Sequence, residues 1–470
     1  MSLQSASTME SAPVAARMLG EIWRALEGPA ALLSNVRLSG SGALPSVFAT
    51  SDLAQASVAA GLAAAELVQT ASGHDVPAVE CDRRLASMWF SASLRAQGWT
   101  PPALWDSVAG DYRCADGWIR LHTNAPHHRA AALQVLGLDA RAAPREDVAR
   151  EVARWKGSEL EAAILANKGC AAEMRSLEQW DAHPQGAAVA AEPLIWRQHF
   201  DASRKPAAIF DPARPLAGVR VLDLTRVLAG PTATRFLAAF GADVLRIDPG
   251  FWDEPGVVPE MTLGKRCAHL DLTRAEDRRM LEGLLAQADV LVHGYRPQAL
   301  EHLGLGAAHR RRLNPALVDV ALDAYGWSGP WAGRRGFDSL VQMSSGIADA
   351  GMRLLGKDKP APLPVQALDH ATGYLLAASA LRGLTRRQAT GEGSECRLSL
   401  ARTARLLVSH PVRSVEPAFA DETAADLGAA QENTVWGPVR RLRAPLQIAG
   451  VPLRWDLPAS PLRSAAAQWR

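Results

Sequence analysis

The most constraining feature of the sequence is a regular alternation of strand-like and helix-like segments between Leu216 and Tyr325. The run VRVLDL is short and rich in aliphatic residues, and Gly230 and Pro231 then lead into a helix-forming stretch, Thr232–Phe240. Strands separated by helices predict βαβ units and therefore a parallel sheet with helices on both faces. The sequence thus predicts an α/β fold with a doubly wound, mostly parallel Rossmann-like sheet, whose expected strands are Val219–Leu224, Asp243–Ile247, Ala268–Leu272, Asp289–Val292 and Leu317–Leu322.

Composition and charge exclude several other classes of protein. The formal net charge of the 470 residues is only +2, whereas a nucleic-acid binder normally shows a concentrated basic face. The five cysteines are scattered and form no C-x-x-C pair, so they indicate neither a zinc site nor a disulfide framework and fit a reducing cytosol. The N-terminus has no signal-peptide pattern, and the apolar stretch Ala56–Val68 is interrupted by Glu66 and predicts a buried helix. We therefore expect a cytoplasmic protein with no membrane or nucleic-acid partner.

Motifs that would specify other ligands are missing from the sequence. No G-x-G-x-x-G motif follows Leu224, so the sheet is not expected to bind a dinucleotide through a glycine-rich turn. No P-loop is present, so a triphosphate held by such a loop is not expected either. The twelve histidines form no H-x-x-x-H pair beside a carboxylate on a predicted helix, so no metal site is expected.

A series of motifs runs through the same part of the chain. The string PLAGVRVLDLTRVLAGPTATRFLAAFGADVLRID (Pro215–Asp248) resembles the N-terminal signature of the class III CoA-transferase family, which includes formyl-CoA and carnitine CoA-transferases and α-methylacyl-CoA racemase. Similar segments follow in the family's order over most of residues 215–460. They are GKRCAHLDL (Gly264–Leu272), ADVLVHGYRPQALEHLGLG (Ala288–Gly306), LNPALVDVALDAYGWSGP (Leu313–Pro330), GFDSLVQMSSG (Gly336–Gly346), ALDHATGYLLAASAL (Ala367–Leu381) and WGPVRRLRAPLQIAGVPLRWD (Trp436–Asp456).

The resemblance implies acyl transfer with Asp369 as the nucleophile. Asp369 stands at the family's catalytic position, just before a helix of small residues. Its carboxylate would attack the acyl-CoA donor to give a mixed anhydride and then an aspartyl-CoA thioester, from which coenzyme A moves to an acceptor carboxylic acid. Backbone N–H groups at the start of that helix are expected to stabilise the oxyanion. The alternative interpretation of Asp369 is a helix N-cap, the commonest role of an Asp in that place.

The resemblance also implies which residues hold coenzyme A and approach the thioester. Arg suits bidentate phosphate contacts and can stack on adenine, although any single Arg is equally well explained as a solvated surface charge. Gly264 replaces the Asn that usually precedes the family's Lys-Arg pair. The expected coenzyme A-binding residues are Arg246, Lys265, Arg266, Tyr295 and Arg296, and the expected active-site loop is Val227, Leu228, Ala229 and Gly230.

The order of the segments departs from the family pattern. Only about thirty residues separate Leu407 from Trp436, where family members carry a smaller α+β domain, and similar segments occur instead at Asp106–Leu138 and Gly169–Gly186. Ser51–Leu67 also repeats the pattern of the Asp369 helix, so Asp52 is expected to be a structural echo of Asp369. The chain therefore resembles a permuted or partly fused variant, with residues 1–200 as a helical region like the second half of a family unit, 201–215 as a linker, 216–410 as the sheet domain with Asp369, and 411–470 as a C-terminal return segment. Family subunits form interlocked dimers, so a homodimer is the expected assembly.

Three functions stay open at this point. A CoA-transferase is favoured over an acyl-CoA racemase or lyase because Phe337 stands where racemases carry a His, and racemisation needs a second base. The third interpretation is a non-catalytic subunit that binds coenzyme A.

Overall fold

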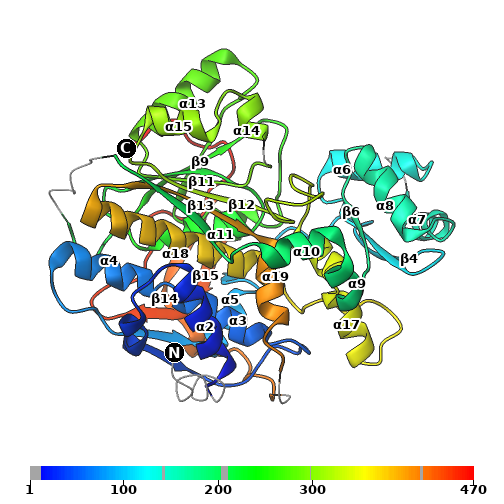
Figure 1. Cartoon of the computed structure of the whole chain (residues 1–470), viewed down its shortest axis with the longest axis horizontal. Helices are drawn as coiled ribbons and strands as arrows, with labels where there is room; N and C mark the ends of the chain where they lie inside the picture. The colour runs from blue at the N-terminus through cyan, green and yellow to red at the C-terminus, as the bar shows by residue number, and fades with distance from the viewer. Residues whose placement is uncertain (1–11, 140–142, 203–209, 297, 413–415) are drawn as a thin grey trace.

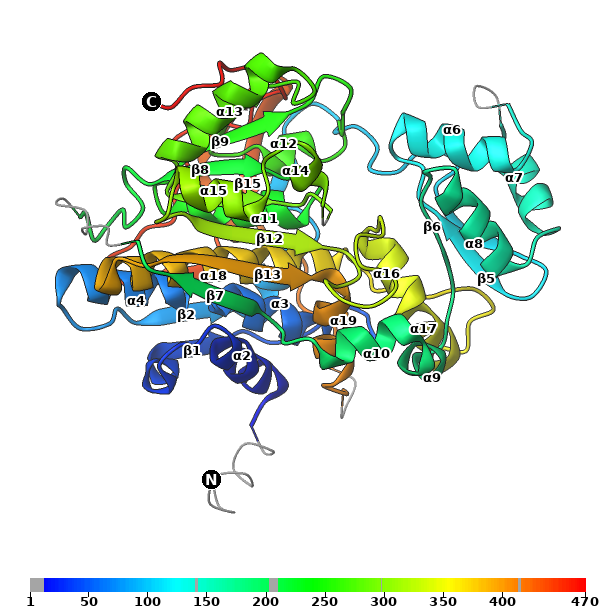
Figure 2. The same ribbon diagram turned by 45° about the horizontal axis from the view of Figure 1, so that its top comes forward.

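A single seven-stranded sheet organises the molecule. The computed structural model describes residues 12–139, 143–202, 210–296, 298–412 and 416–470. The strands lie in the order β10-β9-β8-β11-β12-β13-β7, and all pairs are parallel except that of β13 with β7. Figure 2 shows several of these strands stacked side by side. Their bounds are β7 Trp196–Phe200, β8 Arg220–Leu224, β9 Asp243–Asp248, β10 Lys265–His269, β11 Val290–His293, β12 Val318–Asp323 and β13 Gly393–Ser399.

Helices cover both faces of this sheet, as expected of a doubly wound fold. Alternate side chains of β8 point to opposite faces, so Val221 joins the core under α11 and α18, whereas Leu222 joins the core under α13 and α14. The first parallel strand along the chain, β8, is the third strand of the sheet, and the order of the following strands reverses between β8 and β11. In such sheets ligands bind outside the carboxyl ends of the strands at this switch point. The helices are α11 Ala229–Ala239, α13 Ala275–Gln287, α14 Ala299–His302, α15 Ala307–Leu313 and α18 Ala367–Thr390.

The predicted fold class is confirmed, while some element boundaries differ from those expected. The strand predicted at Ala268–Leu272 is β10, Lys265–His269, because the Lys265 side chain is drawn into the sheet by a buried ion pair with Asp223. The α11 helix begins at Ala229, before Pro231, since proline needs no N–H partner in a first helical turn.

Residues 108–173 form a lobe with its own core beside the carboxyl ends of the sheet strands (Figure 2). Three antiparallel strands pair in the order β4-β5-β6 and pack against three helices. The amphipathic stretch Asp147–Ala166 is divided between two helices, since α7 ends at Val152 and α8 starts at Gly157. The elements of this lobe are β4 Gly110–Arg113, β5 Trp118–Leu121, α6 Pro126–Val135, α7 Arg145–Val152, α8 Gly157–Ala166 and β6 Ala171–Glu173.

The remaining elements bring an N-terminal segment, residues 14–96, together with the C-terminal segment 427–448 below α18 (Figure 1). The helices of the repeated segment, α3 and α4, pack on α18, and their strand β2 pairs with β16 from the C-terminal segment. Strands β14 and β15 form a second small sheet with β3. These elements are α2 Val14–Ala25, β1 Val36–Ser39, α3 Thr50–Ala59, α4 Leu62–Ser72, β2 Val79–Asp82, α5 Arg83–Trp89, β3 Leu94–Ala96, β14 Leu427–Thr434, β15 Gly437–Leu442 and β16 Leu446–Ile448.

Four more helices connect these parts: α9 Leu177–Ala182, α10 Pro184–Ala191, α16 Asp338–Ser344 and α17 Ile347–Leu354. A short α12, Val258–Met261, follows β9, and α19, Leu400–Val408, follows β13. The predicted boundary at residue 200 does not separate the sheet from the preceding region, because β7, which ends at Phe200, is an edge strand of the large sheet. Residues 203–209 of the predicted linker lie outside the described residues. Among the described helices, none combines the length and apolarity needed to cross a bilayer.

Candidate active site

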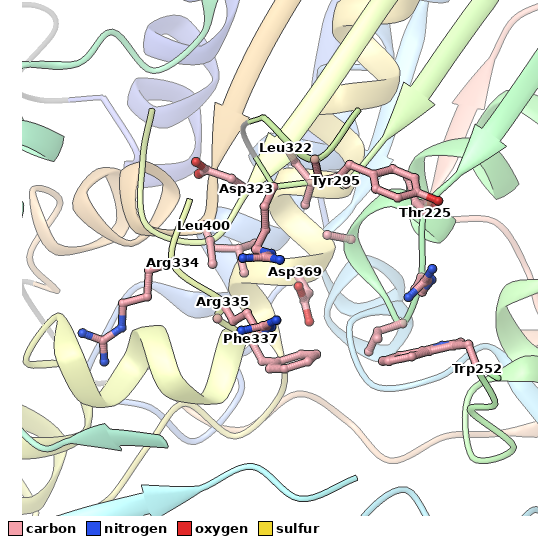
Figure 3. A pocket seen from close by; sticks show the side chains of 18 of the residues that line it. Thr225, Trp252, Tyr295, Leu322, Asp323, Arg334, Arg335, Phe337, Asp369 and Leu400 are labelled. Atoms are coloured by element: carbon pink, nitrogen blue, oxygen red, sulfur yellow. The ribbon is translucent and has the colours of Figure 1, made fainter. Parts of the chain in front are cut away.

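A cavity of about 450 Å³ opens at the switch point of the sheet. Its walls are the segments that follow β8, β11 and β12, together with the lobe residues His127 and His128 and the first turn of α18. Figure 3 shows the Asp369 carboxylate directed into this space, on the side where Phe337 and Trp252 lie. The site therefore lies where a doubly wound sheet normally binds its ligand.

Asp369 is the buried acid of this cavity. It is the third residue of α18, and the N-cap position is Gln366, so Asp369 does not cap the helix and the N-cap interpretation is wrong. The cap comes from another helix, because Asp338 of α16 accepts the Asp369 N–H at 2.8 Å and also a hydrogen bond from the Leu368 N–H. Gln342 donates to the other oxygen of Asp338.

This cap changes the expected role of the helix terminus. The N–H groups of Leu368 and Asp369 are engaged by the Asp338 carboxylate and are not free to stabilise an oxyanion, contrary to the prediction. Within the described part of the chain, the side chain of Asp369 itself forms no hydrogen bond or ion pair. Its oxygens are thus left to meet a ligand.

Burial makes both acids costly to ionise, and the charge of Asp338 adds to this cost for Asp369. Burial, and then the charge of Asp338, raise the pKa of Asp369 well above its ordinary value. Burial raises the pKa of Asp338 to about 6 against the hydrogen bonds that favour its charged form. A carboxylate with little solvation and a raised pKa is a better nucleophile than one in water, provided that it is ionised.

The loop predicted to approach the thioester is held tightly against α18. A Cβ atom on Gly373, one turn after Asp369, would lie 2.4 Å from the Ala229 carbonyl oxygen, and one on Gly230 would lie 2.3 Å from the Thr225 side chain. Val227 has φ of +67°, a conformation that is strained for a β-branched residue. Val227 and Ala229 line the cavity, whereas Gly230 serves the close packing beneath it.

We expect Gly373→Ala to damage the site through this contact. The added methyl group would push the start of α11 away from α18, at a cost of about 1–3 kcal/mol, and would lower activity with any substrate. Gly283→Ala is the matched control, because Gly283 also lies inside a helix but has open space around it, and Ala there should stabilise the protein by about 0.5–1 kcal/mol. Thermal unfolding of both variants measures the difference; equal stabilities would contradict the tight packing.

The predicted coenzyme A-binding residues fall into two groups. Tyr295 and Arg296 line the cavity. Arg246 is completely buried and pairs with Asp248 at 2.9 Å and with Glu254 at 2.5 Å. Because Glu254 also accepts hydrogen bonds from the Val227 N–H and the Trp252 indole, Arg246 acts on the cavity only through this loop.

Two further predicted coenzyme A-binding residues, Lys265 and Arg266, form ion pairs within the protein. Lys265 lies inside the sheet with its ammonium 3.1 Å from Asp223, and burial lowers its pKa to about 8. Arg266 pairs with Asp243 at 3.0 Å and donates to the Gln468 carbonyl, away from the cavity. The geometry thus corrects the assignment of these three residues: Arg246 and Lys265 are buried ion-pair partners, and Arg266 is paired away from the cavity wall. Leu228, the N-cap residue of α11, is half-buried and is not part of the cavity wall.

Other arginines take their place around the cavity. Arg226 stacks over Trp252. Among the described residues, Arg226, Arg296 and Arg335 have no carboxylate partner. Arg334 also lines the cavity but pairs with Glu161 at 2.9 Å. The sequence offered a signal for these residues, since each arginine follows a strand or precedes the Phe337 motif, but it could not distinguish them from other arginines.

The lobe contributes aromatic and imidazole groups to the opposite wall. Phe337 stacks on His122 at 3.7 Å between ring centres, and His128 lies edge-on to Phe337. Burial lowers the pKa of His128 to about 4, so its imidazole is neutral and only weakly basic at neutral pH. Asp323, at the end of β12, is a further acid on the wall, and burial raises its pKa to about 7.

This set of side chains favours an anionic ligand. Three unpaired guanidinium groups surround an opening whose acids have raised pKa values, so phosphates or carboxylates are attracted rather than cations. No group of three or more His, Cys, Asp or Glu side chains in the described ranges could hold a metal ion.

Comparison with known proteins identifies the class of the sheet domain. Residues 216–435 match the model of CoA-transferase family III. This match, which covers slightly less than half of the chain, agrees with the resemblance seen in the sequence.

Several curated proteins are similar to the same region. The probable fatty acyl-CoA transferase Rv3272 of Mycobacterium tuberculosis is 36% identical over 195 residues, which are 38% of this chain and 49% of that protein. Succinyl-CoA:glutarate CoA-transferase of Mus musculus is 33% identical, over 40% of this chain and 46% of the relative. Formyl-CoA:oxalate CoA-transferase of Escherichia coli O81 is 31% identical, over 40% and 47%. The chain thus spans about half the length of the curated relatives it matches.

A crystal structure of Rv3272 aligns with 42% of this chain and 58% of its own, at 32% identity and a TM-score of 0.39.

Proposed function

We propose that this chain is a CoA-transferase that moves coenzyme A from an acyl-CoA donor to a carboxylic acid, with Asp369 as the nucleophile. The observation that carries the proposal is Asp369, which is only 8% exposed and whose carboxylate has no hydrogen-bond or ion-pair partner among the described residues. It faces a cavity whose wall includes three arginines without a carboxylate partner, Arg226, Arg296 and Arg335. The match of residues 216–435 to the model of CoA-transferase family III supports the same chemistry.

The proposed reaction begins with attack of the ionised Asp369 on the thioester carbonyl. The carbon–sulfur bond breaks, the CoA thiolate leaves, and an acyl–aspartyl anhydride forms. The thiolate then attacks the aspartyl carbonyl of the anhydride, which releases the donor's acyl group as a carboxylate and leaves an aspartyl-CoA thioester. The acceptor carboxylate repeats these steps in reverse, so that CoA leaves on the acceptor and Asp369 is regenerated. No net proton transfer is needed, which agrees with the lowered pKa values of the two imidazoles on the cavity wall, His127 and His128.

Coenzyme A would lie along the arginine side of the cavity. Arg226, Arg296 and Arg335 are the available cations for its phosphates, and Tyr295 provides an aromatic ring beside them. Val227 and Ala229, which line the cavity at the start of α11, would bring main-chain groups close to the thioester. We expect Asp338 to act as a positioning residue, since it holds the first turn of α18.

Two alternatives predict different products. An acyl-CoA racemase would bring solvent deuterium into the α-position without any acceptor acid, but Phe337 and the weakly basic His128 leave its second base unaccounted for. A non-catalytic subunit would bind coenzyme A without turnover.

Chemical trapping tests the proposal directly. The protein is incubated with pooled acyl-CoAs and free carboxylic acids, and hydroxylamine is added. We expect exchange of coenzyme A between acids, and conversion of the Asp369 side chain into a hydroxamate that peptide mass mapping locates. If the protein bound coenzyme A but showed neither exchange nor modification of Asp369, the proposal would be contradicted and the non-catalytic subunit would be the favoured function.

A further inference from the structure

A second cavity of about 210 Å³ adjoins the first. The two share three wall residues, Val227, Trp252 and Phe337. Trp252 and Phe337 lie on the side toward which the Asp369 carboxylate points (Figure 3). The other walls of the second cavity are residues around Trp105, lobe residues around His122 and the loop that precedes α12. A thioester carbon held at Asp369, with its coenzyme A among the arginines, would therefore direct its acyl group into the second cavity.

The walls of this cavity carry no positive charge. Not one Arg or Lys is among the described residues that line it. His122 is buried, stacks on Phe337 and meets Trp105 edge-on, and burial lowers its pKa well below the ordinary value, so it is neutral.

Two of the three acids that line this cavity are already paired, and the third is exposed to solvent. Asp106 is paired with Arg129 at 2.6 Å, and Glu254 is paired with Arg246. Asp253 is exposed. A ligand group that entered here would therefore meet aromatic rings and neutral or negative groups, and a second carboxylate would be buried without a partner.

We propose that this cavity is the acyl subsite and that it selects monocarboxylic acids with an uncharged tail over dicarboxylic acids. The proposal rests on the transferase function given above and adds the substrate class. An apolar cavity of about 150 Å³ can hold a benzene ring, so a tail of aromatic or medium-chain size fits this one. The preference would separate this chain from relatives whose names specify oxalate or glutarate.

Two acids of equal length test the substrate class. Hexanoate and adipate differ only by the distal carboxylate, and the wild-type protein should use hexanoate with a kcat/KM at least about 100-fold higher, because the second charge of adipate would be buried unpaired. Val257, which is half-buried in the cavity wall, offers a position for an added cation. Val257→Lys should raise the relative kcat/KM for adipate by about 10- to 100-fold, the gain expected from one charge-assisted hydrogen bond.

Val257→Met is the matched control, since it lengthens the side chain without a charge and should leave the discrimination against adipate in place. If the wild-type protein used adipate and hexanoate equally well while Asp369 was still trapped, the proposed acyl subsite would be wrong and the proposed transferase function would stand. A lack of change in Val257→Lys would overturn the subsite as well. If no acid gave either exchange of coenzyme A or trapping of Asp369, the proposed transferase function would be wrong, and the acyl subsite would be wrong with it.

Discussion

Asp369→Asn should abolish exchange of coenzyme A and at the same time make the protein more stable. The substitution preserves shape but removes the nucleophile, so the rate should fall by about 10⁴-fold or more. It also removes a buried charge that faces the Asp338 carboxylate, and the apparent Tm should rise by a few degrees at about pH 8. Exchange assays and thermal unfolding on the same preparation measure both effects.

The stability gain should depend on pH with a definite sign. The pKa of Asp369 is raised in the folded state, so the folded wild type holds protons more firmly than the unfolded chain does. The wild type therefore loses stability as pH rises above the unfolded value of the carboxyl group toward the folded one, and this loss is absent at low pH. We expect the Tm difference between Asp369→Asn and wild type to be largest at about pH 8 and to shrink toward about pH 4.

Asp52→Asn is the control for this experiment. Asp52 has the same 8% exposure as Asp369 and begins the similar helix α3, but it pairs with Arg83 at 2.9 Å and accepts the Ala15 N–H. Its substitution should lower the Tm and leave the exchange rate per folded molecule unchanged, because it removes one half of a buried pair far from the cavity. A fall in Tm for both variants would contradict the unpartnered state of Asp369.

The sequence alone predicted the architecture of the sheet well. Short aliphatic runs separated by helix-forming stretches specify parallel strands, and the structure has each predicted strand within three residues of its expected start. The sequence predicted Asp369 just before a helix of small residues, and in the structure it is the third residue of that helix, α18. Its freedom from protein partners could not be predicted, since this depends on Asp338 from another helix capping α18.

The roles of individual arginines were beyond the reach of sequence patterns. Arg246 and Arg296 both occur in motifs that resemble the family, yet one lies inside the sheet and the other at the cavity. The difference arises from Asp248 and Glu254, which follow Arg246 closely in sequence and fold back on it. The lobe wall could not be predicted either, because residues 103–128 reach the site only through the tertiary arrangement of the chain.

Arg246→Met should destabilise the protein by about 3–5 kcal/mol, which is the second large effect that the structure predicts. The guanidinium is completely buried, and its loss would leave Asp248 and Glu254 as buried acids without their cation. Because Glu254 also holds the Val227 N–H, the active-site loop should loosen as well. Urea denaturation gives the change in the free energy of unfolding, with intact secondary structure checked by circular dichroism.

Arg296→Met is the matched variant for Arg246→Met, because Arg296 is expected to contact the ligand whereas Arg246 supports the fold. Arg296 is exposed at the cavity, so its loss should leave the unfolding free energy within about 0.5 kcal/mol and weaken coenzyme A binding by about tenfold. The double variant Arg246→Met/Glu254→Gln should recover part of the stability lost in Arg246→Met, since it removes one of the two stranded charges. If Arg246→Met instead kept wild-type stability and lost affinity for coenzyme A, Arg246 would be a ligand contact after all, and the buried pairs would have to open when coenzyme A binds.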